Sequence, residues 1–324
     1  LIAAYYIKTE QAELALRYLD EVLATNPNNV GASFNKAVVL RAQGGTEEAL
    51  QILDTLLAVN KQHTPSHLLA ARIHLEQKNY LEATEQLDKV LLYEQDNRQA
   101  RELKLDTYMQ TAQWSNALAE VEKLNREYIL NERYLSAYAE ILIRLERYED
   151  ADYPLGLLDS IWKEQPNKLI GLARMQAQAK QLANAKSSLL KSHQLAPENM
   201  STLILLTKVE LEQNDLEAAE KTVADLANKF GESSQLFLLQ GDIQMRKSQK
   251  EQAQQKYSKA VELNAFNREA VVRLYQLAKQ GIADDAFHQQ MEGLVTTAAE
   301  LAWHKRILAD SYLHHKQLVQ PHKQ

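Results

Sequence analysis

Apolar and polar residues follow one another along this chain with the three-to-four-residue period of an amphipathic helix. The stretch from Asn26 to Val59 shows the pattern most clearly. It opens with a polar turn, continues with one apolar-periodic run, breaks at Gly44 and Gly45, and then continues with a second run. A helix that buries one face needs such a period, and paired glycines interrupt it. The stretch therefore predicts two helices packed as a hairpin.

The same hairpin pattern returns every 34 residues. A small residue marks the second helix of eight successive hairpins: Ala15, Ala49, Ala83, Ala117, Ala151, Ala185, Ala219 and Ala253. Four residues after this position, a larger apolar residue stands in nine hairpins: Leu19, Leu53, Leu87, Val121, Leu155, Leu189, Val223, Tyr257 and Met291. The small residue lets two helix backbones approach closely, and the large residue fills the space one turn along. We expect both sets to be buried.

The first helix of each hairpin carries a matching position twelve residues before the alanine. Small residues occupy it in most hairpins: Ala3, Ala37, Ala71, Ala139, Ala173, Gly241 and Ala309. Leu105, Thr207 and Tyr275 stand at the remaining ones. Pro27 and Pro197 fall between hairpins, where a proline ends one helix and suits the first turn of the next. The spacing thus places both helices of every hairpin in one register.

This pattern resembles the tetratricopeptide repeat, a helix–turn–helix unit with a 34-residue period. The resemblance covers nearly the whole chain and is strongest over Asn26–Val59, Lys61–Gln95 and Gly241–Ala265. It implies an all-α fold, a right-handed superhelical α-solenoid of about nine repeats plus a final helix, forming one solenoid over residues 1–324. The ninth repeat departs from the pattern, because Phe287 stands where alanine is expected.

The fifth repeat contains an irregularity, because Pro154 falls where its second helix should be continuous. A mid-helix proline costs about 3 kcal/mol. We expect the helix to start late, with Asp152 as its cap and Pro154 in its first position, and Pro166 indicates a next helix shifted forward by three residues. Two interpretations remain open: a local adjustment, or a break over residues 147–166 that divides the superhelix into two halves.

Composition narrows the classes of function. The formal charge of −6 supplies no basic field for nucleic acid phosphates, so we expect no nucleic acid partner. No apolar run approaches the roughly 18 residues that a membrane-spanning helix needs. The absence of cysteine excludes disulfides and thiolate metal sites. Because Leu1 already lies inside a helical pattern, we expect the chain to be a fragment of a longer protein.

No motif for catalysis or cofactor binding is visible. The phosphate-binding loop, the nucleophile elbow and the zinc-protease helix motif are all missing from the sequence. His63 and His67 are four residues apart, but Pro65 between them argues against a shared helix face. We therefore expect no catalytic residue, no cofactor and no metal site.

The resemblance implies a binding surface, since the first helices of tetratricopeptide arrays line a concave groove that receives peptides. The groove positions lie seven, eight, eleven and fifteen residues before each alanine. The residues that we predict to face a partner are Phe34, Val38, Arg41, Leu68, Arg72, Leu75, Glu102, Asp106, Met109, Glu140, Arg144, Arg174, Lys208, Leu238, Asp242 and Arg246. They combine an apolar stripe with charges of both signs, which suits an amphipathic segment or a folded partner. Packing between helices is the alternative role for part of the stripe.

The leading hypothesis is a non-enzymatic scaffold that binds proteins or peptides along a preformed groove. The alternative is a regulatory or targeting segment of a larger enzyme whose catalytic part lies outside this chain. RNA binding by helical repeats is a third class, which the acidic balance disfavours. The texture A-L-x-x-L-D also resembles bacterial repeat lipoproteins of the exopolysaccharide and PEP-CTERM sorting systems. That resemblance implies a location in the periplasm or at the outer membrane, and the oligomeric state stays open.

The register also predicts which side chains carry stability. Leu87 lies on the buried face, so Leu87→Ala should cost about 2–5 kcal/mol. Its neighbour Gln86 lies off that face, so Gln86→Ala should be nearly silent.

Overall fold

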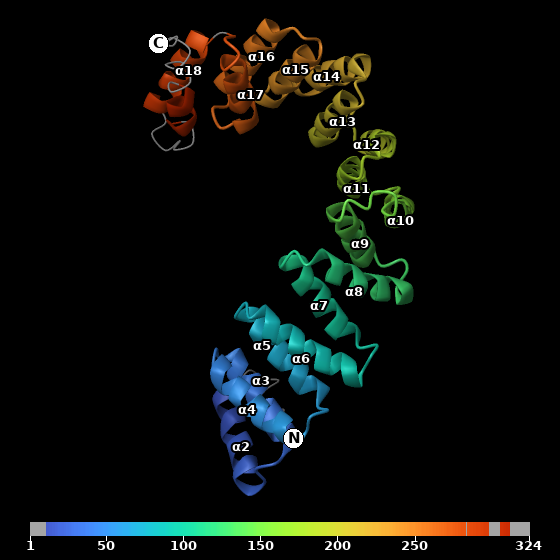
Figure 1. Cartoon of the computed structure of the whole chain (residues 1–324), viewed down its shortest axis with the longest axis vertical. Coiled ribbons are helices and arrows are strands. Elements are labelled where there is room, and N and C mark those ends of the chain that lie inside the picture. Colours follow the sequence, from blue (N-terminus) through green and yellow to red (C-terminus); the bar gives the residue numbers. More distant parts are fainter. Residues whose placement is uncertain (1–10, 283, 298–304, 312–324) are drawn as a thin grey trace, which may run out of the picture. The chain divides into compact units, whose positions relative to one another are not determined.

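A computed structural model describes residues 11–282, 284–297 and 305–311 (Figure 1). All regular secondary structure in these ranges is α-helical. The chain divides into two compact units, residues 1–154 and 155–324. The division falls in the first turn of one helix, directly after Pro154. Each unit is described by itself below.

Unit 1 is a succession of antiparallel helix pairs. Its helices are α2 (Ala12–Thr25), α3 (Val30–Ala42), α4 (Thr46–Val59), α5 (Thr64–Glu76), α6 (Tyr80–Tyr93), α7 (Arg98–Gln110), α8 (Trp114–Glu127) and α9 (Glu132–Arg144). Helices α3 and α4, α5 and α6, and α7 and α8 pack as hairpins, and each hairpin also packs on the next. Helices α3, α5, α7 and α9 are called first helices below, and α3 and α5 contact each other directly.

Unit 2 repeats this plan. Its helices are α10 (Asp152–Trp162), α11 (Pro166–Gln178), α12 (Leu182–Leu195), α13 (Met200–Glu212), α14 (Leu216–Phe230), α15 (Ser234–Arg246), α16 (Lys250–Leu263), α17 (Arg268–Ala278) and α18 (Asp284–Thr297). Its first helices are α11, α13, α15 and α17, with direct contacts from α11 to α13 and from α13 to α15. The predicted all-α solenoid is confirmed, while the hand of the superhelix stays a prediction.

The 34-residue register matches the observed core. All eight alanines of the second helices are fully buried, and the nine larger apolar residues that follow them have exposed fractions of at most 4%. The first-helix position is buried from Ala37 to Gly241, whereas Ala3 lies outside the described residues. At the far end the prediction is wrong, because Ala309 is exposed and its neighbour Leu308 is buried instead. Residues 305–311, the last helical residues that the structure describes, are therefore one position out of register.

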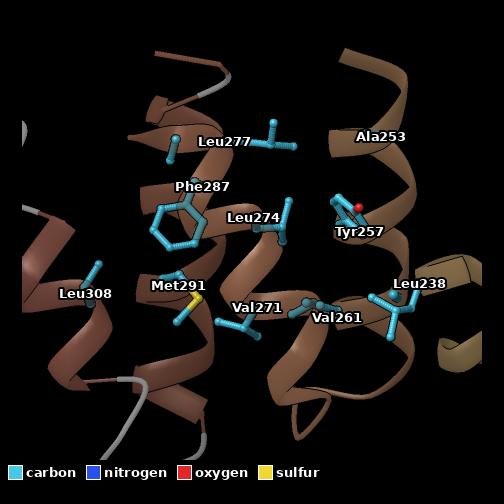
Figure 2. Packing of buried hydrophobic residues seen from close by; sticks show 13 residues of the cluster. Leu238, Ala253, Tyr257, Val261, Val271, Leu274, Leu277, Phe287, Met291 and Leu308 are labelled. Carbon is cyan, nitrogen blue, oxygen red and sulfur yellow. The ribbon is translucent and has the colours of Figure 1, made fainter. Parts of the chain in front are cut away.

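The two register positions compensate for each other in volume. Leu53 and Leu189 pack in clusters with Ala37 and Ala173, whereas the smaller Val121 packs in a cluster with Leu105. The extreme case lies in unit 2, where the ring of Tyr257 is fully buried (Figure 2). This ring requires a glycine opposite it. A Cβ at Gly241 would lie 2.3 Å from Cε1 of Tyr257. The packing density of a protein core explains this inverse relation.

The turns follow the same register. The residue with positive φ that follows each first helix from α3 to α15 recurs every 34 residues: Gly44, Lys78, Ala112, Glu146, Lys180, Asn214 and Ser248. The next amide donates to the carbonyl five residues back in every case, as in Gly45 to Leu40 at 2.9 Å. Asparagines also recur as caps of first helices, for example Asn29, whose side chain accepts from the amide of Ala32 at 2.9 Å. Turn and cap geometry thus repeat even where the turn residue is not glycine.

In the fifth repeat, Pro154 lies in the first turn of α10. Second helices elsewhere start three residues before the register alanine, but α10 starts at Asp152, one residue after Ala151. Its late start agrees with the expectation, but Asp152 is the first helical residue rather than the cap, and Pro154 is the third helical residue rather than the first. The expected forward shift of the next helix is wrong. Helix α11 starts in register with Pro166 in its first turn, because the delay shortens α10 alone.

Candidate partner-binding face

The predicted partner-facing residues lie on the first helices, and most of them are partly exposed. Their apolar members in unit 1 also contribute to the core. Phe34 and Val38 pack against one buried cluster, Leu68 against a second and Met109 against a third. Such side chains offer only part of their surface to a partner. Arg72 and Leu75 on α5 are likewise partly exposed.

Charged side chains link neighbouring first helices in unit 1. Arg41 on α3 pairs with Glu76 on α5. On α9, Arg144 lies 3.7 Å from Glu140 and its guanidinium carbon lies 5.6 Å from the ring centroid of Trp114. These exposed pairs fix the spacing of side chains along the face but add little stability.

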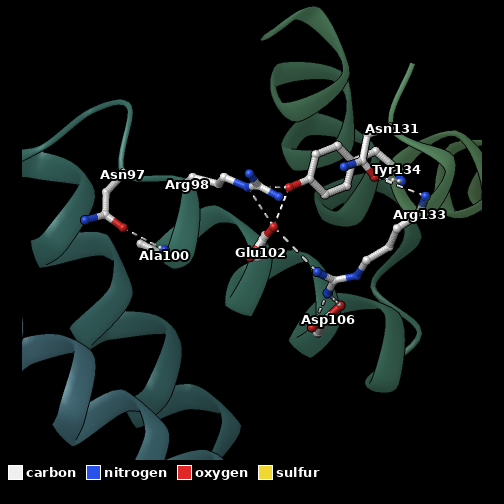
Figure 3. A network of polar contacts seen from close by, with 8 residues as sticks. All are labelled: Asn97, Arg98, Ala100, Glu102, Asp106, Asn131, Arg133 and Tyr134. Atoms are coloured by element: carbon white, nitrogen blue, oxygen red, sulfur yellow. Dashed lines mark hydrogen bonds and ion pairs between the residues drawn. The ribbon is translucent and has the colours of Figure 1, made fainter. Parts of the chain in front are cut away.

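Helices α7 and α9 share a denser polar network (Figure 3). The hydroxyl of the buried Tyr134 donates to Glu102, which also accepts from Nε of Arg98 at 3.0 Å. Arg133 lies 3.6 Å from Glu102 and donates to Asp106 at 2.7 Å. Burial raises the pKa of Glu102, but the hydrogen bonds from Tyr134 and Arg98 and the two arginine charges outweigh it and hold that pKa below its ordinary value. Glu102 and Asp106 therefore already have cationic partners within the protein.

In unit 2 one predicted residue must be removed from the face. Leu238 is fully buried in the cluster that holds Tyr257 and Phe287 (Figure 2). The other predicted residues of this unit lie in two hollows. Arg174 and Lys208 line a hollow of about 400 Å³ between α11 and α13. Lys208 also borders the second hollow.

The second hollow is a cavity of about 330 Å³ between α13, α15 and α17. It brings together three predicted residues, Lys208, Asp242 and Arg246. Its full lining is Lys208, Leu211, Glu212, Asp242, Met245, Arg246, Tyr257, Glu269, Arg273, Gln276, Leu277 and Gln280. Apolar side chains alternate with three acidic and three basic ones. This combination of apolar surface and fixed charge is typical of a binding site.

Asp242 is the most deeply placed charge of the cavity, with 15% of its side chain exposed. Its Oδ1 accepts a hydrogen bond from the hydroxyl of Tyr257 at 2.7 Å. Arg273 places Nε 3.2 Å from the same oxygen, but the two are not aligned as a hydrogen bond. Burial raises the pKa of Asp242, against the opposing effects of Tyr257 and Arg273. Burial together with the charge of Asp242 also raises the pKa of Tyr257 far above its ordinary value, so Tyr257 stays a hydrogen-bond donor.

Sequence reasoning missed two charged residues of this cavity, Glu269 and Arg273 on α17. The Nζ atom of Lys208 lies 3.1 Å from Oε2 of Glu269. A signal for Glu269 exists in the register, because it lies four periods of 34 after Arg133, which also links two first helices. The prediction stopped at α15 because the ninth repeat lacks its alanine.

Comparison with known proteins decides the family. The sequence model of the tetratricopeptide repeat matches residues 6–73 and 42–105. The chain is a tetratricopeptide repeat protein. A chain in the structure of Naa15/Naa10 bound to HypK-THB has the same fold, with a TM-score of 0.59 at 16% identity. The match covers 95% of this tetratricopeptide repeat protein and 50% of that chain, so this sequence spans about half of its length.

Weaker structural matches include two bacterial proteins. A tetratricopeptide repeat protein from Parabacteroides merdae matches with a TM-score of 0.47 at 16% identity, covering 85% of this chain and 95% of that one. PilF of Pseudomonas aeruginosa matches with a TM-score of 0.41 at 19% identity, covering 64% and 94%. No curated protein sequence matches this tetratricopeptide repeat protein.

The described residues contain no group of three or more His, Asp or Glu side chains arranged to hold a metal ion. His67 is instead a buried packing residue, with Nε2 2.9 Å from the carbonyl of Lys61 and Nδ1 2.6 Å from Oε1 of Gln86. Among the described helices, none is both long and apolar enough to cross a bilayer.

Proposed function

We propose that the chain is a non-enzymatic interaction scaffold that holds a peptide segment or a folded protein along its first helices. The observation that supports this most directly is the pair of hollows in unit 2. They are lined by four successive first helices, α11, α13, α15 and α17, and they share Lys208. A segment laid along this face would contact several repeats at once, on a surface that stacking has already ordered.

The absence of cysteine makes the proposal testable by site-specific cross-linking. A single cysteine at Arg246, on the rim of the cavity, would carry a photoreactive maleimide. A matched cysteine at Lys221, exposed on the second helix α14, would serve as control. We expect a protein from extracts of the source organism to be cross-linked from Arg246→Cys and not from Lys221→Cys. Equal labelling from both positions, or none from either, would contradict binding on the first helices.

A bacterial envelope location and a role in exopolysaccharide assembly remain part of the proposal, supported only by the texture of the repeats. Fractionation of the source organism tests them. Recovery of the protein with the cytoplasmic fraction would contradict the envelope location and the role in exopolysaccharide assembly, but it would not contradict the scaffold function.

A further inference from the structure

Only one of the two carboxylate oxygens of Asp242 accepts a hydrogen bond from a described residue. Its Oδ1 receives the hydrogen bond from Tyr257 and faces Arg273. Its Oδ2 accepts no hydrogen bond from a described residue, and it is not fully enclosed by protein atoms. Because Asp242 lines the cavity, this oxygen is open to a ligand there. A carboxylate oxygen at pH 7 accepts hydrogen bonds and does not donate them, so the complementary group is a donor.

The acidic Asp242 is more deeply buried than the basic side chains of the cavity, and this difference favours a cationic donor as its ligand. The side chain of Asp242 is 15% exposed, whereas the basic Arg273 and Lys208 are 43% and 36% exposed. Coulomb interactions are stronger at the buried charge than at the exposed ones, which water and salt screen. The raised pKa of Asp242 agrees with this, because burial outweighs the positive charges that surround it. The negative charge at the bottom of the cavity is therefore only partly compensated by Arg273, although the formal charges of the lining balance.

We propose that this cavity receives a lysine or arginine side chain of the protein partner and that Asp242 binds its charge. This deepens the proposed scaffold function and rests on it. Met245, which is partly exposed, supplies apolar surface against which the aliphatic stem of such a side chain packs, and Leu211 and Leu277, which are almost fully buried, complete the apolar lining. Glu212 on the rim has no ion pair with a described residue and adds a second carboxylate. A charge-assisted hydrogen bond to Oδ2 completes the site.

The ion pair between Lys208 and Glu269 restrains the same site. It joins α13 to α17 across the intervening first helix α15, on which Asp242 lies. The ammonium of Lys208 is thus paired with the carboxylate of Glu269, which an incoming cation would otherwise contact. Lys208→Gln should free Glu269 and strengthen binding of a basic side chain severalfold. Loss of Asp242 should have the opposite effect.

The five methionines of the chain provide a direct readout, because Met245 lines the cavity and Met109, Met175, Met200 and Met291 do not. Protein with 13C-labelled methionine methyl groups would be titrated with capped pentapeptides that carry one central arginine, lysine, citrulline or glutamate. We expect the arginine and lysine peptides to shift the methyl signal of Met245 and to leave the other four unchanged. A response to citrulline of equal strength, a response to glutamate alone, or no response at Met245 would overturn the proposal.

Two variants link the response to the carboxylate. Asp242→Asn keeps an acceptor for Tyr257 and should weaken binding of the arginine peptide by about tenfold or more. Glu220→Gln removes a carboxylate that pairs with Lys247 outside the cavity, and its binding should equal that of the wild type. Equal affinities of wild type and Asp242→Asn for the arginine peptide would overturn the assignment. The Lys208→Gln variant, which should bind the arginine peptide more strongly than the wild type, tests the assignment independently.

Failure here is distinguishable from failure of the scaffold function. If cross-linking from Arg246→Cys succeeds while no basic peptide reaches Met245, the scaffold stands and the cavity assignment falls. If basic peptides bind at Met245 but no partner is cross-linked, the scaffold falls and the chemistry of the cavity stands.

Discussion

The two units contain the same pair of groups in opposite electrostatic settings. In each, the hydroxyl of a fully buried tyrosine donates to a carboxylate on a first helix, Tyr134 to Glu102 in unit 1 and Tyr257 to Asp242 in unit 2. Two arginines surround Glu102, and its pKa lies below the ordinary value. Asp242 has one misaligned arginine beside a cavity, and its pKa is raised. A carboxylate satisfied within the protein stabilises the fold, whereas one left partly unsatisfied is available to a partner.

The largest expected effect tests what the tyrosines share. Tyr134→Ala and Tyr257→Ala each remove a fully buried ring, so each should lower the free energy of unfolding by about 3–5 kcal/mol. Thermal and urea unfolding of both variants measure this. If either variant unfolds at the same temperature and urea concentration as the wild type, that tyrosine is not a core residue, and the two sites are not comparable.

The next effect concerns the packing that holds Tyr257. Gly241→Ala would place a Cβ 2.3 Å from Cε1 of the fully buried Tyr257 ring, so the ring or the helix must shift, and the variant should cost about 1–3 kcal/mol. Gly171→Ala on α11 is the matched control, because no atom lies within 4 Å of its added Cβ. The control should be stabilised by about 0.5–1 kcal/mol, since alanine suits a helix better than glycine. Stabilisation of both variants would show that Tyr257 is loosely packed.

A third test addresses the carboxylates themselves and predicts opposite signs. Glu102→Gln loses its charge-assisted bonds to arginine, so its unfolding midpoint at pH 7 should fall, by about 1–2 kcal/mol in free energy. Asp242→Asn removes a buried charge that is under-compensated, so its midpoint should stay equal or rise. A clear loss of stability in Asp242→Asn would show that Asp242 is as well satisfied as Glu102.

The pH dependence of these differences follows from the direction of each pKa shift. The pKa of Glu102 is lowered by folding, so its stabilisation is complete above the unfolded value and is lost as pH falls through the folded one. The pKa of Asp242 is raised, so its cost is present above the folded value and disappears as pH falls through it. Tyr257, Arg273, Glu269 and Lys208 are the groups whose interactions set the pKa of Asp242. Both variants should approach wild-type stability in acid, from opposite sides.

The smallest expected effect is at the ion pair over the cavity. Lys208 and Glu269 are 36% and 46% exposed, so Lys208→Gln should change stability by no more than about 0.5 kcal/mol. A loss of more than about 1 kcal/mol on thermal unfolding would contradict this role. The pair would then be a structural link between α13 and α17 rather than a restraint on ligand entry.

Sequence reasoning predicted the core well because burial follows the 34-residue register. The eight alanines and the residues one turn later are all buried, and even Phe287 is buried at the alanine position of the degenerate repeat. Pattern alone did not separate core from surface at the edge of that register. Leu238 was predicted to face a partner but is covered because Tyr257 and its cluster pack over it.

Polar partners were not predictable from periodicity. Gln86 lies off the core face as expected, yet its Oε1 lies 2.6 Å from Nδ1 of the buried His67. The structure therefore replaces the expectation of a silent Gln86→Ala with a cost of about 1–3 kcal/mol for an unpaired ring nitrogen. The contrast between Glu102 and Asp242 has the same origin. It depends on which arginines reach each carboxylate. Arg98 lies one turn from Glu102 on the same helix, but Arg133 and Arg273 reach their carboxylates from other helices, and those contacts do not follow from periodicity.

The most direct test of the central claim is a titration of the side-chain carboxyl carbons of Asp242 and Glu102 by 13C NMR in the folded protein. We expect a pKa of Asp242 above the ordinary value of 3.8 and a pKa of Glu102 below the ordinary value of 4.5. A pKa of Asp242 at or below 3.8 would mean that the protein already satisfies this carboxylate, and it would contradict its assignment as the group that binds a partner.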